Sequence, residues 1–266
     1  MIRGQEKLCQ KIDTHTMDTF PRTILLLGEY GSGKHTIVNY IANKFSIEVE
    51  DISDIITLET IDNISQRTFP KIYVIESNKL TIKNENVILK FLEEPLKNAF
   101  IIVLSESKYS IIPTILNRCQ VWELSTYEQD FLSAFVKDIN VKNEVLMRVA
   151  NTPGKVIEYQ NYPLEDMTQL AVKIFNNIGK ANIANALTLS RFVAFKNEKD
   201  KFDFNLFLDI LLMISVDRCR QNCELCTQTY LLTVRLNNNK YLFNIDKKAL
   251  FENYLIELKL LMSGGN

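Results

Sequence analysis

Residues 24–35 read ILLLGEYGSGKH, and this stretch decides the fold that the sequence predicts. Its first four residues are apolar, which is typical of a short strand buried on both faces of a parallel sheet. The next seven match the pattern G-x-x-x-x-G-K of a phosphate-binding loop. Apolar residues then recur at helical spacing through 34–45, which predicts a helix directly after the loop. A strand, this loop and a helix, in that order, are the context that the motif requires.

Glycine is rare in the rest of the chain. Only 8 of the 266 residues are glycine, and three of these (Gly28, Gly31 and Gly33) fall in this loop. The usual share of glycine is about 7%, so the cluster indicates a local need of the backbone. Glycines let successive N–H groups converge on phosphate oxygens, and Lys34 at the start of the helix can reach the β- and γ-phosphates. The loop predicts a phosphate-loop fold, and it leaves open whether ATP or ADP binds.

Two positions depart from a working ATP site. After the loop lysine, a Ser or Thr normally ligates Mg²⁺, but this chain has His35, with Thr36 one step late. Because a helix turns about 100° per residue, Thr36 should point elsewhere. The next buried strand ends in a single acid, Glu76, where ATPases of this kind hold the metal and activate water. We therefore expect Mg²⁺ only if nucleotide binds, and no ATP hydrolysis by this chain's own site.

Buried strands and helices alternate in the first half of the chain. Further strands are predicted at 72–75, 100–104 and 121–124, with an amphipathic helix around 87–92. Such alternation predicts an α/β fold with a parallel sheet. From 126 onward helical periodicity prevails, with a strongly apolar helical run at 202–233 and a final helix at 247–261. We predict an α/β domain at 1–125, a small helical domain at 126–195 and a helical C-terminal domain at 196–266.

The bulk composition excludes several classes of protein. A hydrophobic fraction of 46% and a charged fraction of 24% are those of a globular chain, not of a disordered or fibrous one. The net charge of −1 lacks the basic excess of a protein that binds nucleic acid alone. There is no run of 18 apolar residues and no apolar signal-peptide core at the start. We therefore expect a cytoplasmic protein, away from membranes, whose five cysteines are reduced thiols.

Two further segments resemble a known family. Residues 86–95 read NVILKFLEEP, and residues 100–119 read FIIVLSESKYSIIPTILNRC. They resemble the helix ending in Leu-Glu-Glu-Pro, and the following strand and Ser-Arg-Cys segment, of bacterial DNA polymerase III clamp-loader subunits, an AAA+ family. Asn117 replaces the serine of that segment. The degraded nucleotide site is similar to that of delta-prime-type subunits, which lack effective ATP hydrolysis but keep the arginine.

The resemblance implies roles for particular residues. Arg118 would be an arginine finger that enters the ATP site of a neighbouring ATPase subunit. A guanidinium neutralises charge on the transferring phosphoryl group, and in trans it can be worth about 10³–10⁵ in rate. Ser105 would occupy the first sensor position and Lys155 the second, where the family usually has Arg. Together with the residues of the loop and of the acidic strand end, the residues assigned to the nucleotide site are Gly28, Gly31, Ser32, Gly33, Lys34, His35, Thr36, Glu76, Ser105 and Lys155.

The resemblance also implies an architecture and partners. The three predicted domains would be an AAA+ phosphate-loop domain, a helical lid and a helical collar. The chain would join gamma- or tau-like ATPases and a delta-like subunit in a hetero-oligomeric ring, and would meet the sliding clamp and primer-template DNA through that assembly. Family members often carry a four-cysteine zinc module between the phosphate loop and the acidic strand. No cysteine lies between Gly33 and Glu76, so we expect no zinc.

Two alternatives remain at this point. The chain could be an active gamma- or tau-like ATPase that uses Thr36 and Glu76 in altered geometry. It could also be a metal or radical enzyme, since Cys219-x3-Cys223-x2-Cys226 has the spacing of radical S-adenosylmethionine enzymes, whose thiolates hold an iron–sulfur cluster. Positions i, i+4 and i+7 also share one face of a helix, and cysteine packs as a small hydrophobe. We therefore expect these cysteines to pack in the core.

Overall fold

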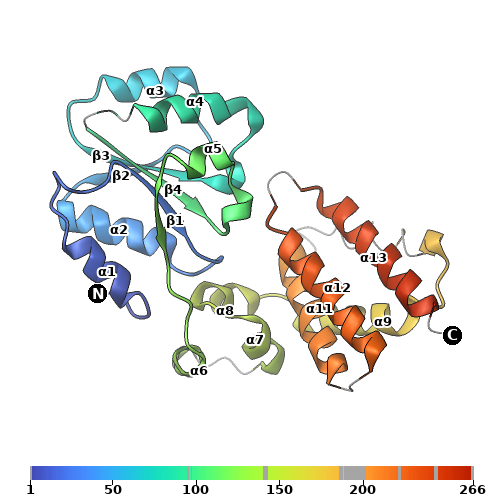
Figure 1. Ribbon diagram of the computed structural model, residues 1–266. Helices are drawn as coiled ribbons and strands as arrows, with labels where there is room; N and C mark the ends of the chain where they lie inside the picture. Colours follow the sequence, from blue (N-terminus) through green and yellow to red (C-terminus); the bar gives the residue numbers. More distant parts are fainter. Residues whose placement is uncertain are drawn as a thin grey trace. The chain divides into compact units, whose positions relative to one another are not determined.

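The computed structural model describes residues 2–94, 96, 98–139, 143–185, 188, 202–220, 223–242 and 245–264 (Figure 1). The chain forms two compact units. One comprises Met1–Leu132 with Thr152–Gly154, and the other comprises Ser133–Asn151 with Lys155–Asn266.

The first unit is built on a parallel five-stranded sheet with the strand order β2-β3-β4-β1-β5. The strands are β1 (Thr23–Leu27), β2 (Glu48–Asp51), β3 (Lys71–Glu76), β4 (Ala99–Ser105) and β5 (Gln120–Glu123). The helices of this unit are α1 (Glu6–Asp13), α2 (Lys34–Phe45), α3 (Leu58–Ser65), α4 (Ile82–Glu93) and α5 (Pro113–Leu116), with short 3-10 turns at Ser77–Lys79 and Lys108–Ser110. The expected α/β fold is confirmed.

Helices cover both faces of the sheet (Figure 1). Along β1, Ile24 and Leu26 pack in one apolar cluster with residues of α1 and α2, whereas Leu25 and Leu27 pack in another with residues of α3 and α4. Successive side chains of a strand point to opposite faces, so a strand covered on both sides is apolar throughout. This is why residues 24–27 contain no polar side chain. The carboxyl ends of the parallel strands meet at one edge, where the phosphate loop begins.

The four strands expected from apolar runs are all present, and α2 has the expected bounds. The sequence interpretation missed β2, which reads EVED and forms the sheet edge beyond β3. Val49 is its one apolar side chain and is 37% exposed. An edge strand with little burial leaves no apolar signature, and acidic residues are depleted in strands generally.

In the described residues of the second unit, all regular secondary structure is helical. Its helices are α6 (Gln129–Asp138, from Ser133 onward), α7 (Glu144–Val149), α8 (Pro153–Tyr159, from Lys155 onward), α9 (Leu164–Asn177), α11 (Phe204–Cys219), α12 (Glu224–Asn239) and α13 (Lys247–Ser263). Phe207 and Leu211 of α11 and Phe251 and Leu255 of α13 are fully buried in one core cluster. The same cluster includes Leu146 of α7, so α7 shares this core with the C-terminal helices.

The apolar run 202–233 is helical, but it is two helices and not one. α11 ends at Cys219 and α12 begins after Cys223, whose sulfur accepts a hydrogen bond from the N–H of Cys226 and so caps the helix. Cys223 and Cys226 form a disulfide, with Cα atoms 5.2 Å apart. Two expectations are therefore wrong: the three cysteines do not share one buried helix face, and the five cysteines are not all thiols. Cys223 is exposed and Cys219 is half-buried.

The division into three domains stays a prediction, and its boundary at 195 lies outside the described residues. None of the helices within the described ranges combines the length and the apolar character needed to cross a membrane.

Candidate functional site

The phosphate loop connects β1 to α2 at the carboxyl edge of the sheet. The N–H of Gly28 donates a 3.1 Å hydrogen bond to the carbonyl oxygen of Ser105, which ends β4. Gly31 and Gly33 have φ angles of 71° and 97°, a left-handed conformation that costs other residues free energy. The loop meets the N-terminus of α2, whose first N–H groups lack partners within the helix. These are the backbone features that phosphate binding requires.

Ser32 adds a polar atom to the loop. Its side-chain oxygen is buried and, among the described residues, makes no hydrogen bond. Its carbonyl oxygen accepts a 2.8 Å bond from the hydroxyl of Tyr127, which fixes the loop backbone. A buried hydroxyl without a partner is costly, and a phosphate oxygen would satisfy it. The loop therefore fits a phosphate group.

The loop lysine is turned onto its own loop. The ammonium of Lys34 donates hydrogen bonds of 2.6 Å and 2.9 Å to the carbonyl oxygens of Gly28 and Glu29. Burial lowers the pKa of Lys34, and nearby carboxylates, Glu106 foremost, act in the opposite direction. These two carbonyl groups hold the ammonium of Lys34 against the backbone at the start of the loop.

The position of the metal ligand is taken by an imidazole. Nε2 of His35 lies 3.1 Å from Oε1 of Glu76, the acid at the end of β3. Thr36, one position further along α2, is exposed. Mg²⁺ prefers oxygen ligands, and here the expected hydroxyl is an imidazole that already contacts the carboxylate. The residues present do not fit the usual Mg²⁺ site of a phosphate loop.

Small polar residues complete the carboxyl edge. Ser77, after β3, donates a 3.0 Å hydrogen bond to the hydroxyl of Ser105, and both side chains are buried. At the end of β2, Asp51 accepts hydrogen bonds from both the N–H and the hydroxyl of Ser53, and the Ser53 hydroxyl in turn accepts from the N–H of Glu76. Burial acts to raise the pKa of Asp51, but these bonds outweigh it and the pKa is lowered. Sequence reasoning missed Asp51 and Ser53 because it missed β2.

Residues 152–154, which belong to the first unit, pack on the phosphate loop of the same unit. The hydroxyl of Thr152 donates a 2.7 Å hydrogen bond to the carbonyl oxygen of Tyr30, and the N–H of Gly154 donates a 3.0 Å bond to that of Gly31. A Cβ atom on Gly154 would lie 2.9 Å from the carbonyl oxygen of Gly31 and closer still to its Cα. Only glycine allows this approach of two backbones.

Lys155 begins the second unit and pairs within it. Its side chain is 5% exposed, and its ammonium donates a 2.9 Å hydrogen bond to the amide oxygen of Asn151 and lies 3.7 Å from Asp209. The other carboxylate oxygen of Asp209 accepts a 2.5 Å bond from Lys240, whose side chain is 2% exposed. The role of Lys155 as a second sensor stays a prediction. The contacts of its ammonium in the structure are those of a buried ion pair with Asp209.

Arg118 lies between α5 and β5 and is anchored at both ends. Its carbonyl oxygen accepts a 2.9 Å hydrogen bond from the hydroxyl of Thr23 at the start of β1. Its Nε donates a 2.7 Å hydrogen bond to Oε1 of Glu93, the last residue of α4, and Nη2 donates to the same oxygen. Nη1 donates a 2.8 Å bond to the carbonyl oxygen of Thr114 in α5. The side chain of Arg118 is 33% exposed, so its guanidinium is held in place and still accessible.

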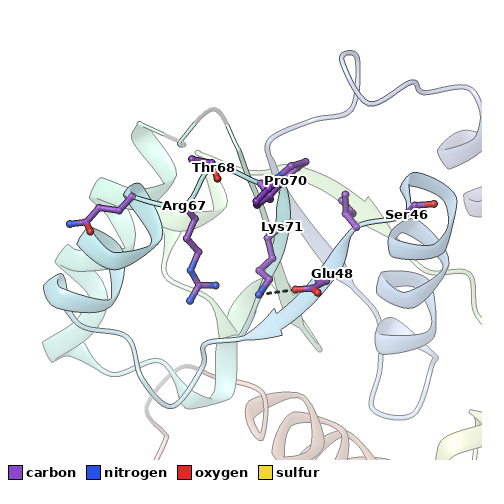
Figure 2. A pocket seen from close by; sticks show the side chains of 9 residues that line it. Ser46, Glu48, Arg67, Thr68, Pro70 and Lys71 are labelled. Carbon is purple, nitrogen blue, oxygen red and sulfur yellow. Dashed lines mark ion pairs between the residues drawn. The ribbon is translucent and has the colours of Figure 1, made fainter.

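A separate pocket lies at the opposite edge of the sheet, at the amino ends of β2 and β3 (Figure 2). It has a volume of about 510 Å³, and Lys71 in its wall pairs with Glu48. Phe69 at its rim is 81% exposed. Because Lys71 begins β3 and Glu76 ends it, this pocket is distinct from the phosphate loop.

The fold therefore brings most of the predicted nucleotide residues to one edge of the first unit. Gly28, Lys34, His35, Glu76 and Ser105 are linked there through the contacts given above. Lys155 belongs to the second unit. The hydrogen bonds of Arg118 go instead to β1, α4 and α5.

Comparison with known proteins agrees with these features. Residues 7–128 match the model of the family described as DNA polymerase III, delta subunit. The chain is 31% identical over 110 residues to the DNA polymerase III subunit delta' of Haemophilus influenzae, covering 41% of this chain and 32% of that protein. It is 27% identical over 89 residues to the delta' subunit of Bacillus subtilis, covering 33% and 27%. The matched part thus spans about a third of the length of these relatives.

Solved structures are similar over more of the chain but at lower identity. A RuvB protein of Thermotoga maritima has 15% identity and a TM-score of 0.48, covering 96% of this chain and 86% of that one. A DNA polymerase III gamma subunit-related protein of the same organism has 16% identity and a TM-score of 0.45, covering 97% and 99%. Both TM-scores lie below 0.5, so the fold assignment rests on the sheet order and the phosphate loop of the chain itself. Residues 7–128 are thus similar to DNA polymerase III delta' subunits and match the model of the corresponding family, which covers a little under half of this chain.

Proposed function

We propose that this chain is a delta-prime-like subunit of a DNA polymerase sliding-clamp loader in DNA replication, and that Arg118 acts on ATP held by a neighbouring ATPase subunit. The observation that carries the proposal is that Arg118 is held by hydrogen bonds and yet remains accessible. Its backbone is tied to β1, its guanidinium is bonded to α4 and α5, and a third of the side chain remains exposed. An arginine that acts in trans must be both fixed and accessible, because it has to meet a phosphoryl group in another subunit.

The chain's own nucleotide site is proposed to be degenerate. The glycine loop and Ser32 suit a phosphate group, which supports binding of ATP or ADP. The contact between His35 and Glu76 opposes a Mg²⁺ site. A working site uses one acidic residue as a metal ligand and another to activate water, whereas Glu76 is the single acid at the end of β3. Such a site would retain the architecture of an ATPase without its turnover.

The partners follow from the same proposal. They would be gamma- or tau-like ATPases and a delta-like subunit in a hetero-oligomeric ring, with the sliding clamp and primer-template DNA reached through the assembly. The net charge of −1 supports this arrangement, because a chain without basic excess gains little affinity for DNA alone.

The alternative is a gamma- or tau-like subunit that binds and hydrolyses ATP itself. The left-handed glycines of an intact loop favour it, and the exposed position of Thr36 opposes it. Steady-state ATP turnover by the purified chain separates the two. The proposal expects turnover at the background of a Lys34→Ala control, with or without Mg²⁺. Steady Mg²⁺-dependent turnover that Lys34→Ala abolishes would establish the alternative.

Reconstitution with the candidate ATPase subunits tests the role in trans. The proposal expects that Arg118→Ala assembles normally but lowers clamp- and DNA-stimulated ATP hydrolysis to the unstimulated level. Lys108→Ala is a matched control, because Lys108 is an exposed cation of the same unit that pairs with Glu123. Unchanged stimulation with Arg118→Ala would remove the proposed role.

A further inference from the structure

Arg118 is held by a carboxylate from a different element. Glu93 ends α4, 25 positions earlier in the chain, and its Oε1 accepts hydrogen bonds from both Nε and Nη2 of Arg118. With the bond from Nη1 to the Thr114 carbonyl, all three nitrogens of the guanidinium are bonded within this chain. These bonds use three of the five N–H groups of an arginine. Two N–H groups, one on each Nη atom, are left without a partner among the described residues, and such a pair is suited to two oxygens of a phosphoryl group.

The elements beside Glu93 and Arg118, helices α4 and α5, are anchored by buried side chains. On α4, Phe91 and Leu92 directly before Glu93 are buried, and on α5, Ile115 is fully buried. The N–H of Arg118 donates a 3.0 Å bond to the carbonyl oxygen of Ile115. The carboxylate and the arginine therefore extend from elements that are packed into the same apolar cluster. A side chain held on such elements loses less freedom when it meets a ligand.

The pair contributes little to folding. The Arg118 side chain is 33% exposed and that of Glu93 is 48% exposed, and ion pairs at this exposure are screened by water. The C-terminal end of α4, where Glu93 lies, also favours a nearby cation through the helix dipole. The effect of these contacts is thus on where the guanidinium lies and how it is oriented.

We propose that Glu93 is the positioning residue of Arg118, orienting its guanidinium so that the outer Nη N–H groups meet the γ-phosphate of ATP in the neighbouring subunit. This inference rests on the proposed function, and it adds a residue on a second element to the trans-acting site. Misplacement of a reacting group by about 1 Å can cost on the order of 100-fold in rate. Loss of the carboxylate should therefore lower the rate in the assembly without removing the arginine.

The test compares Glu93→Ala, Glu93→Gln and Arg118→Ala in the reconstituted assembly with ATP, the clamp and primer-template DNA. Glu94→Ala is the matched control, since Glu94 is the next residue, is exposed and carries the same charge. We expect Glu93→Ala to lower kcat about 10- to 100-fold with an unchanged KM for ATP and normal assembly. Glu93→Gln keeps an acceptor oxygen and should recover part of the rate, and Glu94→Ala should match the wild type. The double variant Glu93→Ala, Arg118→Ala should equal Arg118→Ala alone, because positioning requires the arginine.

A second measurement needs no partner. In the isolated chain, the Nε–H of Arg118 should give an NMR signal protected from exchange with water, and Glu93→Ala should abolish that protection while the thermal unfolding curve stays the same. If Glu93→Ala hydrolyses at the wild-type rate while Arg118→Ala does not, the positioning role is wrong and the proposed function stands. If Arg118→Ala also leaves stimulation unchanged, the proposed function fails, and this inference fails with it. Loss of assembly or of thermal stability in Glu93→Ala would overturn the inference by assigning Glu93 a structural role.

Discussion

The approach of Gly154 to the phosphate loop makes the most direct structural prediction. Replacing Gly154 by Ala would place a Cβ atom 2.9 Å from the carbonyl oxygen of Gly31 and 3.1 Å from its carbonyl carbon. Both are backbone atoms, so no side chain can rotate away to make room. The segment 152–154 must therefore move off the loop.

The expected cost follows from the contacts that this movement breaks. Inserting a methyl group into a packed site costs about 1–3 kcal/mol. The bonds from Gly154 to Gly31 and from Thr152 to Tyr30 are lost as well, at about 1 kcal/mol each. Alanine is a better helix former than glycine by at most about 1 kcal/mol, and Gly154 lies in the first turn of α8. Gly154→Ala should therefore make the packing of segment 152–154 on the loop less favourable by about 2–4 kcal/mol of free energy.

Hydrogen exchange measures this cost where it arises. Since 1.4 kcal/mol corresponds to a factor of ten, amides of residues 28–34 and of Gly154 should exchange about 30-fold faster or more in Gly154→Ala. Gly264→Ala is the matched control, because its Cβ would meet its nearest atom at 3.4 Å, an ordinary contact. Exchange in the loop that is unchanged by Gly154→Ala, and no faster than in Gly264→Ala, would show that residue 154 does not need to be glycine to pack on the loop.

Three further outcomes are expected. Asp209→Asn removes the carboxylate that Lys240 contacts in the interior, so it should lower the free energy of unfolding by about 3–5 kcal/mol in urea titration; a change below about 1 kcal/mol would contradict the ion pair. Burial disfavours the thiolate and raises the pKa of Cys119 to about 12, so iodoacetamide at pH 8 should leave Cys119 unmodified in the folded chain and react with it in urea. The disulfide between Cys223 and Cys226 predicts three titratable thiols in the denatured, unreduced protein and five after reduction, and five without reductant would exclude it.

The parts of the fold that bury apolar surface were predictable from the sequence. Strands β1, β3, β4 and β5 and helix α2 carry unbroken or periodic apolar patterns because they are covered on one or both sides. β2 was missed because it lies at the edge of the sheet and is largely acidic. The break after Cys219 was missed because the polar residues that follow it, 220–222, include neither Pro nor Gly.

Only the parts of the candidate site whose residues are close together in the sequence could be predicted. The spacing of the glycines and Lys34 carries the loop, and α2 places His35 directly after it. The contact of His35 with Glu76, across 41 positions, follows from the strand order, which a single sequence does not contain. The same holds for the bond between Glu93 and Arg118 and for the approach of Gly154 to the loop. Such contacts are set by tertiary packing and leave no periodic signal along the chain.

The proposed action of Arg118 on ATP in a neighbouring subunit can be measured in the reconstituted assembly. The measurement that tests it most directly is the ratio of clamp- and DNA-stimulated ATP hydrolysis rates in assemblies containing wild-type chain and Arg118→Ala, at equal assembly and saturating ATP. Because an arginine supplied in trans can be worth about 10³–10⁵ in rate, we predict a ratio of about 10³ or more for the stimulated step. A ratio near one in fully assembled complexes would show that Arg118 does not act on the ATP of a neighbouring subunit.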